Sequence, residues 1–177
     1  DLGAEKFFNI KCRKAGLKPA MSVLVATSQA LKLSGGADPK TMMLPDLAVL
    51  SKGVRNLEKH ISILKSFRQK VLVVLNRYHF DTAEEITWLR NWCAEKEVAF
   101  AVNDGFTHGG EGALEMAQAV VDICENPSPA IQHTYELSDD IETKIRKVVT
   151  TIYGGTDVVL YKKAQKKKKK IKSLGLE

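Results

Sequence analysis

Two short segments hold the residue types that suit ligand binding. They are "NRYHFDT" (76–82) and "NDGFTHGGEG" (103–112). Each places an aromatic ring among amides, carboxylates or glycines, so a flat ligand could stack on the ring while polar groups bind its edge. Paired glycines before a helical pattern also raise the possibility of a phosphate cradle. The chemistry alone makes the two segments candidates for a joint binding site.

The phosphate-cradle hypothesis is poorly supported. The pattern GxxxxGK[ST] is absent from the sequence, and no Lys–Ser/Thr pair follows "GGEG". The glycines instead favour a tight turn, in which they supply positive φ and allow close backbone approach. The segment "NRYHFDT" is faintly similar to the Asn–Lys–x–Asp element of GTPases, but Asn76 and Asp81 are too far apart for that motif. Asp81 could instead be a turn or cap residue.

Other catalytic and metal-binding patterns are missing. The four histidines are scattered and form neither HExxH nor a Cys/His cluster, so we expect no metal site. No GxSxG motif is present, which leaves acyl-enzyme chemistry without support. The three cysteines, Cys12, Cys93 and Cys124, lie outside any CxxC pair and predict reduced thiols in a cytosolic protein.

The elements that must position the two segments follow an alternating pattern. Apolar runs of strand length at 20–27, 70–76 and 98–103 are separated by helical patterns, and the first run reads as a buried strand. Parallel strands need such crossovers, so the fold class is α/β with a parallel sheet flanked by helices. Ligands bind beyond the carboxyl ends of the strands in such sheets, where both segments lie.

The helices and loops between these strands have recognisable signals. Helices are expected over residues 4–16 and 111–125. Another helix is expected where apolar residues spaced three and four apart run from Leu47 to Leu64, and a further one should begin at the capping box of Thr82 and Glu85. Glycines and prolines predict a loop over 31–45.

A different unit is expected after "NPSPA" (126–130). The predicted order is a helix near 139–153, a short strand "DVVLY" (157–161) and a lysine-rich helix. We therefore place a domain boundary near residue 130. Residues 1–130 would form part of an α/β domain, and residues 131–177 the beginning of a smaller α+β subdomain.

The net charge of +6 comes from one local run. Eight of the 27 basic residues are lysines within 162–172, which leaves 19 basic against 20 acidic residues in 1–161. We interpret the run as a solvated helix face, so no nucleic-acid or membrane partner is predicted; binding of an anionic surface by counterion release is the alternative. The longest apolar runs have strand length, well short of the roughly 20 residues of a membrane span.

Taken together, the segments resemble the formate–tetrahydrofolate ligase family. "DLGAEKFFNIKCRKAGLKP" resembles its G-A-D-L/I-G-x-E-K-F-F-x-I-K-C-R segment, and "VLVATSQALKLSGG" its V-V-L-V-A-T-x-R-A-L-K-x-H-G-G. "GVRNLEKHI" resembles G-x-x-N-L-x-K-H-I, and "VLNRYHFDTAEEI" the Asn–x–Phe–x–x–Asp–Thr stretch. "NDGFTHGGEGALEMA" resembles Ser–Glu–x–Trp–Ala–x–Gly–Gly–x–Gly. The resemblance runs collinearly through nearly all 177 residues and becomes thinner after about residue 155.

The resemblance implies a P-loop NTPase-like three-layer domain, of which this chain is a part. It also implies that two aromatics enclose the folate ring system, and by position these are Tyr78 and Phe106. The residues beside them are implied pocket residues: Asn76, Asp81, Gly109, Gly110, Glu111 and Gly112.

The family's reaction is the ATP-dependent joining of formate to tetrahydrofolate through formyl phosphate. The resemblance implies formate, ATP with Mg and tetrahydrofolate as substrates, a cytoplasmic location and a homo-oligomer. It places the Walker A loop and the main catalytic residues upstream of Asp1, so the catalytic residues are unknown here and the chain alone is expected to be inactive. Departures at Gln29, Ser34, Tyr78 and Phe106 motivate the alternative, a non-catalytic binding or assembly relative.

Overall fold

Residues 3–176 are described by a computed structural model of the chain. The chain divides into two compact units, one formed by residues 19–130 and the other by residues 1–18 together with 131–177. One boundary between the units falls after residue 130. Residues 1–18, however, belong to the same unit as residues 131–177. The expected domains 1–130 and 131–177 of a longer protein stay a prediction.

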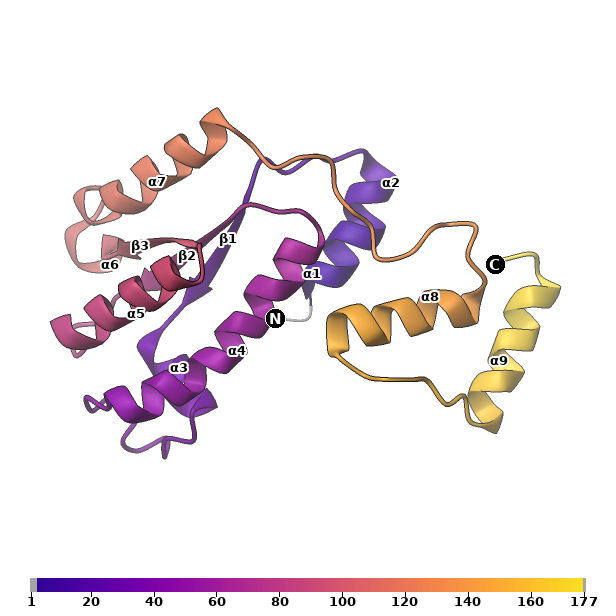
Figure 1. Cartoon of the computed structure of the whole chain (residues 1–177), viewed down its shortest axis with the longest axis horizontal. Coiled ribbons are helices and arrows are strands. Elements are labelled where there is room, and N and C mark those ends of the chain that lie inside the picture. The colour runs from indigo at the N-terminus through magenta and orange to yellow at the C-terminus, as the bar shows by residue number, and fades with distance from the viewer. Residues whose placement is uncertain (1–2, 177) are drawn as a thin grey trace. The chain divides into compact units, whose positions relative to one another are not determined.

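The unit 19–130 is built on a parallel sheet of three strands (Figure 1). The strands are β1 (Ser22–Ala26), β2 (Val71–Asn76) and β3 (Ala99–Asn103), in the order β1-β2-β3. Val73 pairs in register with Leu24 on one side and with Phe100 on the other. The α/β class and the parallel sheet flanked by helices are thereby confirmed.

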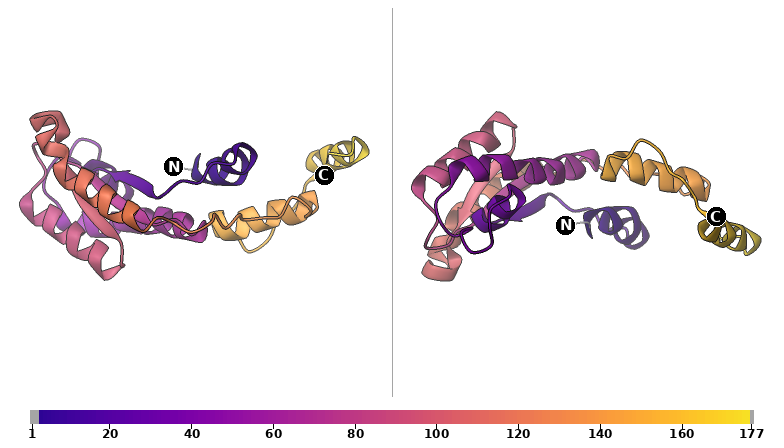
Figure 2. Two further views of the ribbon diagram at one scale, coloured as in Figure 1. Left: turned by 90° about the horizontal axis from the view of Figure 1, so that it is seen from above. Right: turned by 90° about the horizontal axis from the view of Figure 1, so that it is seen from below.

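The central strand β2 is buried on both faces. Its continuous apolar run, Val71 to Leu75, is at most 7% exposed, as expected where helices cover both sides of a parallel sheet. Leu72 and Val74 pack with Ala101 against helix α7 (Leu114–Glu125). Helices α4 (Leu47–Ser66) and α5 (Ala83–Glu95) also contact the strands; Figure 2 shows the ribbon from two further sides.

Strand β1 differs from the expectation of a buried strand. Val23 is 43% exposed and Val25 55% exposed, while the alternate residues are half-buried. The physical reason is position: β1 is at the edge of the sheet, where its residues have a neighbouring strand on one side only.

The predicted loop 31–45 is shorter in the structure, because its first residues are helical. Helix α3 runs over Ser28–Ser34 and is capped by Thr27, whose side-chain oxygen accepts from the amide of Ala30 at 3.2 Å. A threonine at the end of a strand thus starts a helix where the glycines suggested only a loop.

Helices α3 and α4 approach closely through two glycines. A Cβ on Gly53 would lie 1.7 Å from the carbonyl oxygen of Leu31, and a Cβ on Gly35 would lie 2.0 Å from that of Val49. Glycine is therefore required at both positions for this packing. The apolar face predicted for the long helix is confirmed, with Leu50, Val54, Leu57, Ile61 and Leu64 buried.

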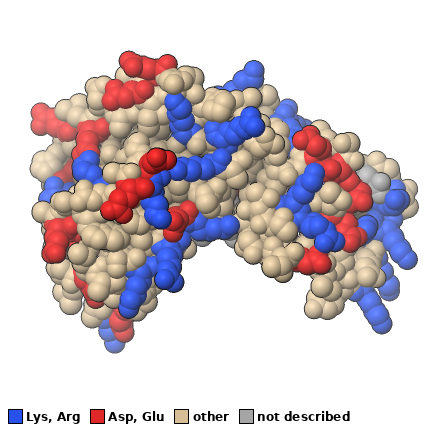
Figure 3. Space-filling view, in the orientation of Figure 1, with Lys and Arg blue, Asp and Glu red and all other residues tan. Residues whose placement is uncertain are grey.

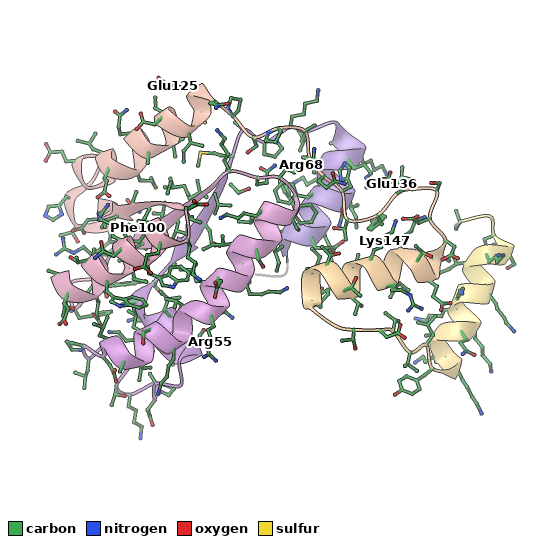
Figure 4. All side chains as sticks on the ribbon, viewed as in Figure 1. Arg55, Arg68, Phe100, Glu125, Glu136 and Lys147 are labelled. Atoms are coloured by element: carbon green, nitrogen blue, oxygen red, sulfur yellow. The ribbon has the colours of Figure 1, made fainter. Side chains whose placement is uncertain are left out.

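Helix α5 begins with the predicted capping box. The amide of Glu85 donates to Thr82 Oγ1 at 3.2 Å, and the Glu85 carboxylate reaches back to the amide of Thr82. The Arg90 guanidinium of this helix lies 5.0 Å from the ring centroid of Phe100 on β3; Phe100 is labelled in Figure 4. That cation–π contact ties α5 to the sheet.

The other unit consists of helical segments. The first is continuous through α1 (Gly3–Lys6), a π-helical stretch η1 (Phe7–Cys12) and α2 (Arg13–Ala15), and it ends at Gly16 with φ 66°. The second is α8 (Ile141–Val148) with η3 (Val149–Tyr153), and it ends at Gly154 with φ 73°. Both ends were predicted from the sequence. Asn9 links the first segment to the irregular chain before α8, since its Nδ2 donates to Thr134 Oγ1 at 3.0 Å.

The prediction of a strand at residues 157–161 is wrong. The segment is irregular, with Val159 74% exposed, because no strand in the described part of this unit is available to pair with it. The lysine-rich helix is confirmed as α9 (Lys162–Ser173), and most of its lysines are exposed (Figure 3), whereas Lys168 is half-buried and pairs with Glu142. Across residues 3–176 no helix has the length and apolar character to cross a membrane.

Candidate functional site

A cavity of about 470 Å³ lies where strands β2 and β3 end. Its lining comes from both segments that the sequence analysis singled out: Asn76, Arg77, Tyr78, His79, Asn103, Phe106 and Thr107. The predicted joint site at the carboxyl edge of the sheet therefore exists as a geometric feature. Three of the predicted site residues meet there: Asn76, Tyr78 and Phe106.

The two aromatic side chains are available to a ligand. Phe106 has 102% of its reference surface exposed, so it does not pack into the core of the described chain. Tyr78 is 43% exposed, and its ring stacks on Phe80 with centroids 5.3 Å apart and an interplanar angle of 5°. One face of the Tyr78 ring is thus covered by the Phe80 ring, which restrains the orientation of Tyr78.

The two segments are joined by a hydrogen bond between amide side chains. Asn76 and Asn103 are partners in the strand register, and Asn103 Nδ2 donates to Asn76 Oδ1 at 2.8 Å. The amide of Arg77 also donates to the carbonyl of Asn103 at 3.0 Å, which extends the ladder one residue beyond β2. The floor of the cavity is therefore a continuation of the sheet.

Asp104 organises the rim. Its carboxylate lies 3.2 Å from Arg77 Nη1 and 3.3 Å from His108 Nδ1. Its amide donates to the carbonyl of Gly112 at 2.9 Å, which closes the loop that carries Phe106 on the short helix α6 (Gly105–His108).

The glycines of this loop serve its geometry. Gly109 has φ 59°, and a Cβ on Gly112 would lie 2.3 Å from the carbonyl oxygen of Asp104. Gly110 has open space around it, and Glu111 is exposed at the start of the 3₁₀ turn η2 (Glu111–Ala113). None of these four residues lines the cavity. They turn the chain tightly, as the sequence analysis proposed for the glycines.

Asp81 lies beneath the site and does not line it. The residue is 6% exposed, and its carboxylate accepts from the amide of Tyr78 at 2.9 Å and from the hydroxyl of Ser28. Asp81 therefore ties the Tyr78 turn to the first turn of α3. Its contacts are those of a residue that positions Tyr78.

Four lining residues were missed by the sequence analysis: Arg77, His79, Asn103 and Thr107. All four lie within the two quoted segments, so the only available signal was their place just after a strand. The sequence could not separate lining residues from supporting ones, because both kinds alternate within a few positions of a loop.

The remaining titratable groups of residues 3–176 form no cluster of metal ligands. No group of three or more His, Cys, Asp or Glu side chains could hold a metal ion within the part of the chain that is described. The cysteines are free; Cys12 and Cys93 are buried and Cys124 is exposed. Burial raises the pKa of the Cys93 thiol to about 11, so it is not a ready nucleophile.

The arrangement can bind a flat, conjugated ring. Two aromatic side chains from different strand ends offer stacking surface, and the amide of Asn76, whose oxygen accepts from Asn103, offers a hydrogen-bond donor. The same layout suits a heteroaromatic molecule better than a compact anion, since Arg77 is already paired with Asp104.

Comparison with known proteins identifies the family. The family model described as formate–tetrahydrofolate ligase matches residues 1–177. Proteins named formate–tetrahydrofolate ligase from Parabacteroides distasonis and Campylobacter concisus are 52% and 47% identical over 177 residues, or 99% of this chain. The chain spans about a third (32%) of the length of these relatives. It belongs to the formate–tetrahydrofolate ligase family.

Proposed function

We propose that the full-length protein joins formate to tetrahydrofolate at the expense of ATP, and that this chain supplies the folate-side wall of the site. The observation that carries the proposal is the cavity between Tyr78 and Phe106, at the ends of β2 and β3, in a chain of this family. The product would be 10-formyltetrahydrofolate. The relatives that bear the family name support the substrate class.

The pteridine ring of the folate would bind between the two aromatics. Tyr78 is held from below by Phe80 and through its amide by Asp81, so one stacking face is in place before the ligand arrives. Phe106 is fully exposed and would lose much of that exposure on binding. Stacking of a heterocycle on one aromatic side chain contributes about 1–3 kcal/mol.

The chemical step would proceed through formyl phosphate. A formate oxygen attacks the γ-phosphorus of ATP and displaces ADP, and the tetrahydrofolate nitrogen then attacks the formyl carbon and displaces phosphate. In this scheme the residues of the cavity bind and orient the folate and exclude water from the reacting face. The sequence lacks GxxxxGK[ST], so residues 1–177 alone are predicted to show no turnover. Magnesium would enter with ATP and not on ligands of this chain.

Three further properties belong to the same proposal. The protein would be cytoplasmic, in keeping with three free cysteines, and it would form a homo-oligomer. In the full-length protein, residues 1–130 would belong to the nucleotide- and folate-binding domain and residues 131–177 to a C-terminal subdomain.

A folate titration of the full-length protein tests the proposal. We expect Tyr78→Ala and Phe106→Ala each to weaken binding at least about tenfold, because each removes one stacking face. Tyr161→Ala is the matched control, since Tyr161 is an exposed aromatic (79%) outside the site. Unchanged affinity in both site variants would remove the folate assignment.

The alternative of a non-catalytic binding relative predicts a different combination of results. In that case folate would still bind to the wild-type protein and be lost in Tyr78→Ala, but no 10-formyltetrahydrofolate would form with formate and ATP. Measurement of product alongside binding therefore separates the two functions.

A further inference from the structure

The side-chain amides at the floor of the cavity form a directional relay. The amide N–H of Gly105 donates to Asn103 Oδ1 at 3.2 Å, and Asn103 Nδ2 donates to Asn76 Oδ1 at 2.8 Å. A carboxamide has one acceptor atom and one donor group. Because a backbone N–H can only donate, the contact with Gly105 fixes which end of Asn103 faces Asn76.

The reverse arrangement of the relay is disfavoured. Turning the Asn103 amide over would place its NH₂ group against the N–H of Gly105, so that two donors would face each other. The space is also tight at this point, since a Cβ on residue 105 would lie 3.0 Å from Asn103 Oδ1. The glycine lets the backbone N–H come close enough to hold the oxygen.

The orientation of Asn76 follows from that of Asn103. Asn76 Oδ1 is the acceptor of the relay, so the group of Asn76 that remains for a ligand is its Nδ2 donor. Asn76 is half-buried and lines the cavity, so this NH₂ group lies at the cavity wall. The cavity therefore offers an amide donor close to the two aromatic rings.

The charged groups at the rim are paired with one another. Arg77 and His108 both lie against the Asp104 carboxylate, at 3.2 and 3.3 Å. Asn103 uses its oxygen and one N–H of its amide within the relay. The Asn76 NH₂ group takes no part in the relay, so its hydrogen-bonding character should influence which edge of a ring fits against it.

We propose that Asn103 is a positioning residue that locks Asn76 with its NH₂ group toward the cavity, so that the site selects rings bearing a carbonyl oxygen over rings bearing an amino group at that edge. The inference rests on the proposed function, and it adds a specificity determinant to it. For folates it means that a 4-oxo pteridine is accepted and its 4-amino counterpart is disfavoured, because an amino group would face the Asn76 donor.

Binding of two matched probes to the full-length protein tests the inference. The probes are folate, which carries the 4-oxo group, and aminopterin, which carries a 4-amino group, titrated at neutral pH where both rings are uncharged. We expect wild type to prefer folate by about tenfold, the effect of one satisfied against one opposed hydrogen bond.

Asn103→Asp is the diagnostic substitution. A carboxylate can still accept from the Gly105 N–H but cannot donate to Asn76, so the Asn76 amide would turn over and present its oxygen to the cavity. The ratio of the folate affinity to the aminopterin affinity should then fall to about one, or the preference should reverse in favour of aminopterin. Asn126→Asp makes the same chemical change at an exposed position of the same unit and should leave the preference at the wild-type value.

Asn76→Leu provides a second, independent variant. It removes the donor without changing Asn103, so it should reduce folate binding toward that of aminopterin while leaving aminopterin binding nearly unchanged. A preference that stays within twofold of wild type in both Asn103→Asp and Asn76→Leu would overturn the inference.

The two proposals fail in distinguishable ways. If neither probe binds wild type, or if Tyr78→Ala leaves both affinities unchanged, the folate site itself is wrong and the inference falls with it. If Tyr78→Ala weakens both probes but the relay variants do not alter the preference, only the inference is wrong.

Discussion

Lys32 Nζ lies 2.7 Å from Glu85 Oε1, and both side chains are almost completely buried, with 0% and 3% of their surface exposed. The pair connects α3 to α5. Lys32 Nζ also donates to the carbonyl of Leu44 at 2.9 Å, and Glu85 Oε1 accepts from the amide of Asp46 at 3.0 Å. The ion pair thereby holds both helices and the end of the loop between α3 and α4 in one network.

Breaking this pair should strongly destabilise the protein. We expect Glu85→Gln to lower the free energy of unfolding by about 3–5 kcal/mol, because it leaves the Lys32 ammonium buried without a countercharge. Urea denaturation of the full-length protein measures the effect. The double variant Lys32→Met/Glu85→Leu removes both charges and should therefore lose less free energy of unfolding than Glu85→Gln. If the Glu85→Gln protein were as stable as wild type, the buried pair would be dispensable.

The same pair makes stability depend on pH. Burial alone would raise the pKa of Glu85, but hydrogen bonds from Lys32 and from the amides of Asp46 and Thr82, together with the Lys32 charge, hold the pKa below the ordinary value of 4.5. A carboxyl with a lowered folded pKa contributes stability that is complete above 4.5 and is lost as the pH falls through the folded value.

Denaturation midpoints between about pH 7 and pH 3 test this linkage. The wild-type midpoint should fall on acidification below pH 4.5, and the Glu85→Gln protein should show a smaller loss because the titrating group is gone. Parallel pH profiles for the two proteins would contradict the assignment.

Gly53→Ala should destabilise the unit 19–130. The new methyl group would lie 1.7 Å from the carbonyl oxygen of Leu31, a backbone atom that cannot move aside without shifting α3. We expect the free energy of unfolding to fall by about 3 kcal/mol or more, which is at or above the largest cost usually seen when a core is overpacked. Gly110→Ala is the matched control, since open space surrounds that position. Equal thermal midpoints for both variants would show that the helices can separate at little cost.

Asp81→Asn should weaken folate binding without touching the ligand. The new side chain keeps one oxygen, so it cannot accept from both the Tyr78 amide and the Ser28 hydroxyl. We expect a loss of about 1–3 kcal/mol in stability and a weaker affinity for folate, because the Tyr78 turn is released. Ser28→Ala removes only the second contact and should retain more of the folate affinity. Comparison of near-ultraviolet circular dichroism in the two variants reports whether the Tyr78 environment has changed.

Cysteine labelling should distinguish the three thiols. Cys124 is exposed, whereas Cys12 and Cys93 are buried and burial raises the pKa of both. A thiol with a pKa of about 11 is a thiolate in fewer than about one molecule in a thousand near neutral pH. Brief alkylation followed by peptide mass mapping should therefore modify Cys124 first, and Cys124→Ser should abolish the early product. Early modification of Cys93 would show that α5 opens readily.

Much of the fold was predictable from short-range patterns. The apolar face of α4, the capping box of Thr82 and Glu85, and the glycine that ends the first helical segment are all local signals, and the structure bears them out. The position of the candidate site was also predictable, because polar and aromatic residues just after parallel strands lie at one edge of the sheet.

The errors concern properties that depend on partners distant in sequence. The residues at 157–161 have strand-like composition but no strand to pair with, and β1 has the composition of a buried strand but lies at an edge. Burial and pairing are properties of the neighbours, and a single segment does not encode them.

For this protein, the sequence by itself determined the alternating α/β elements, their caps and the two segments that form the cavity. Only the tertiary structure decided that Lys32 pairs with Glu85, that Asp81 accepts from Ser28, and that Asn103 orients Asn76. The physical reason is that caps and periodicities depend on residues a few positions apart. The buried ion pair and the bond between Asn103 and Asn76 join residues at least 27 positions apart in the sequence, and packing brings those atoms together.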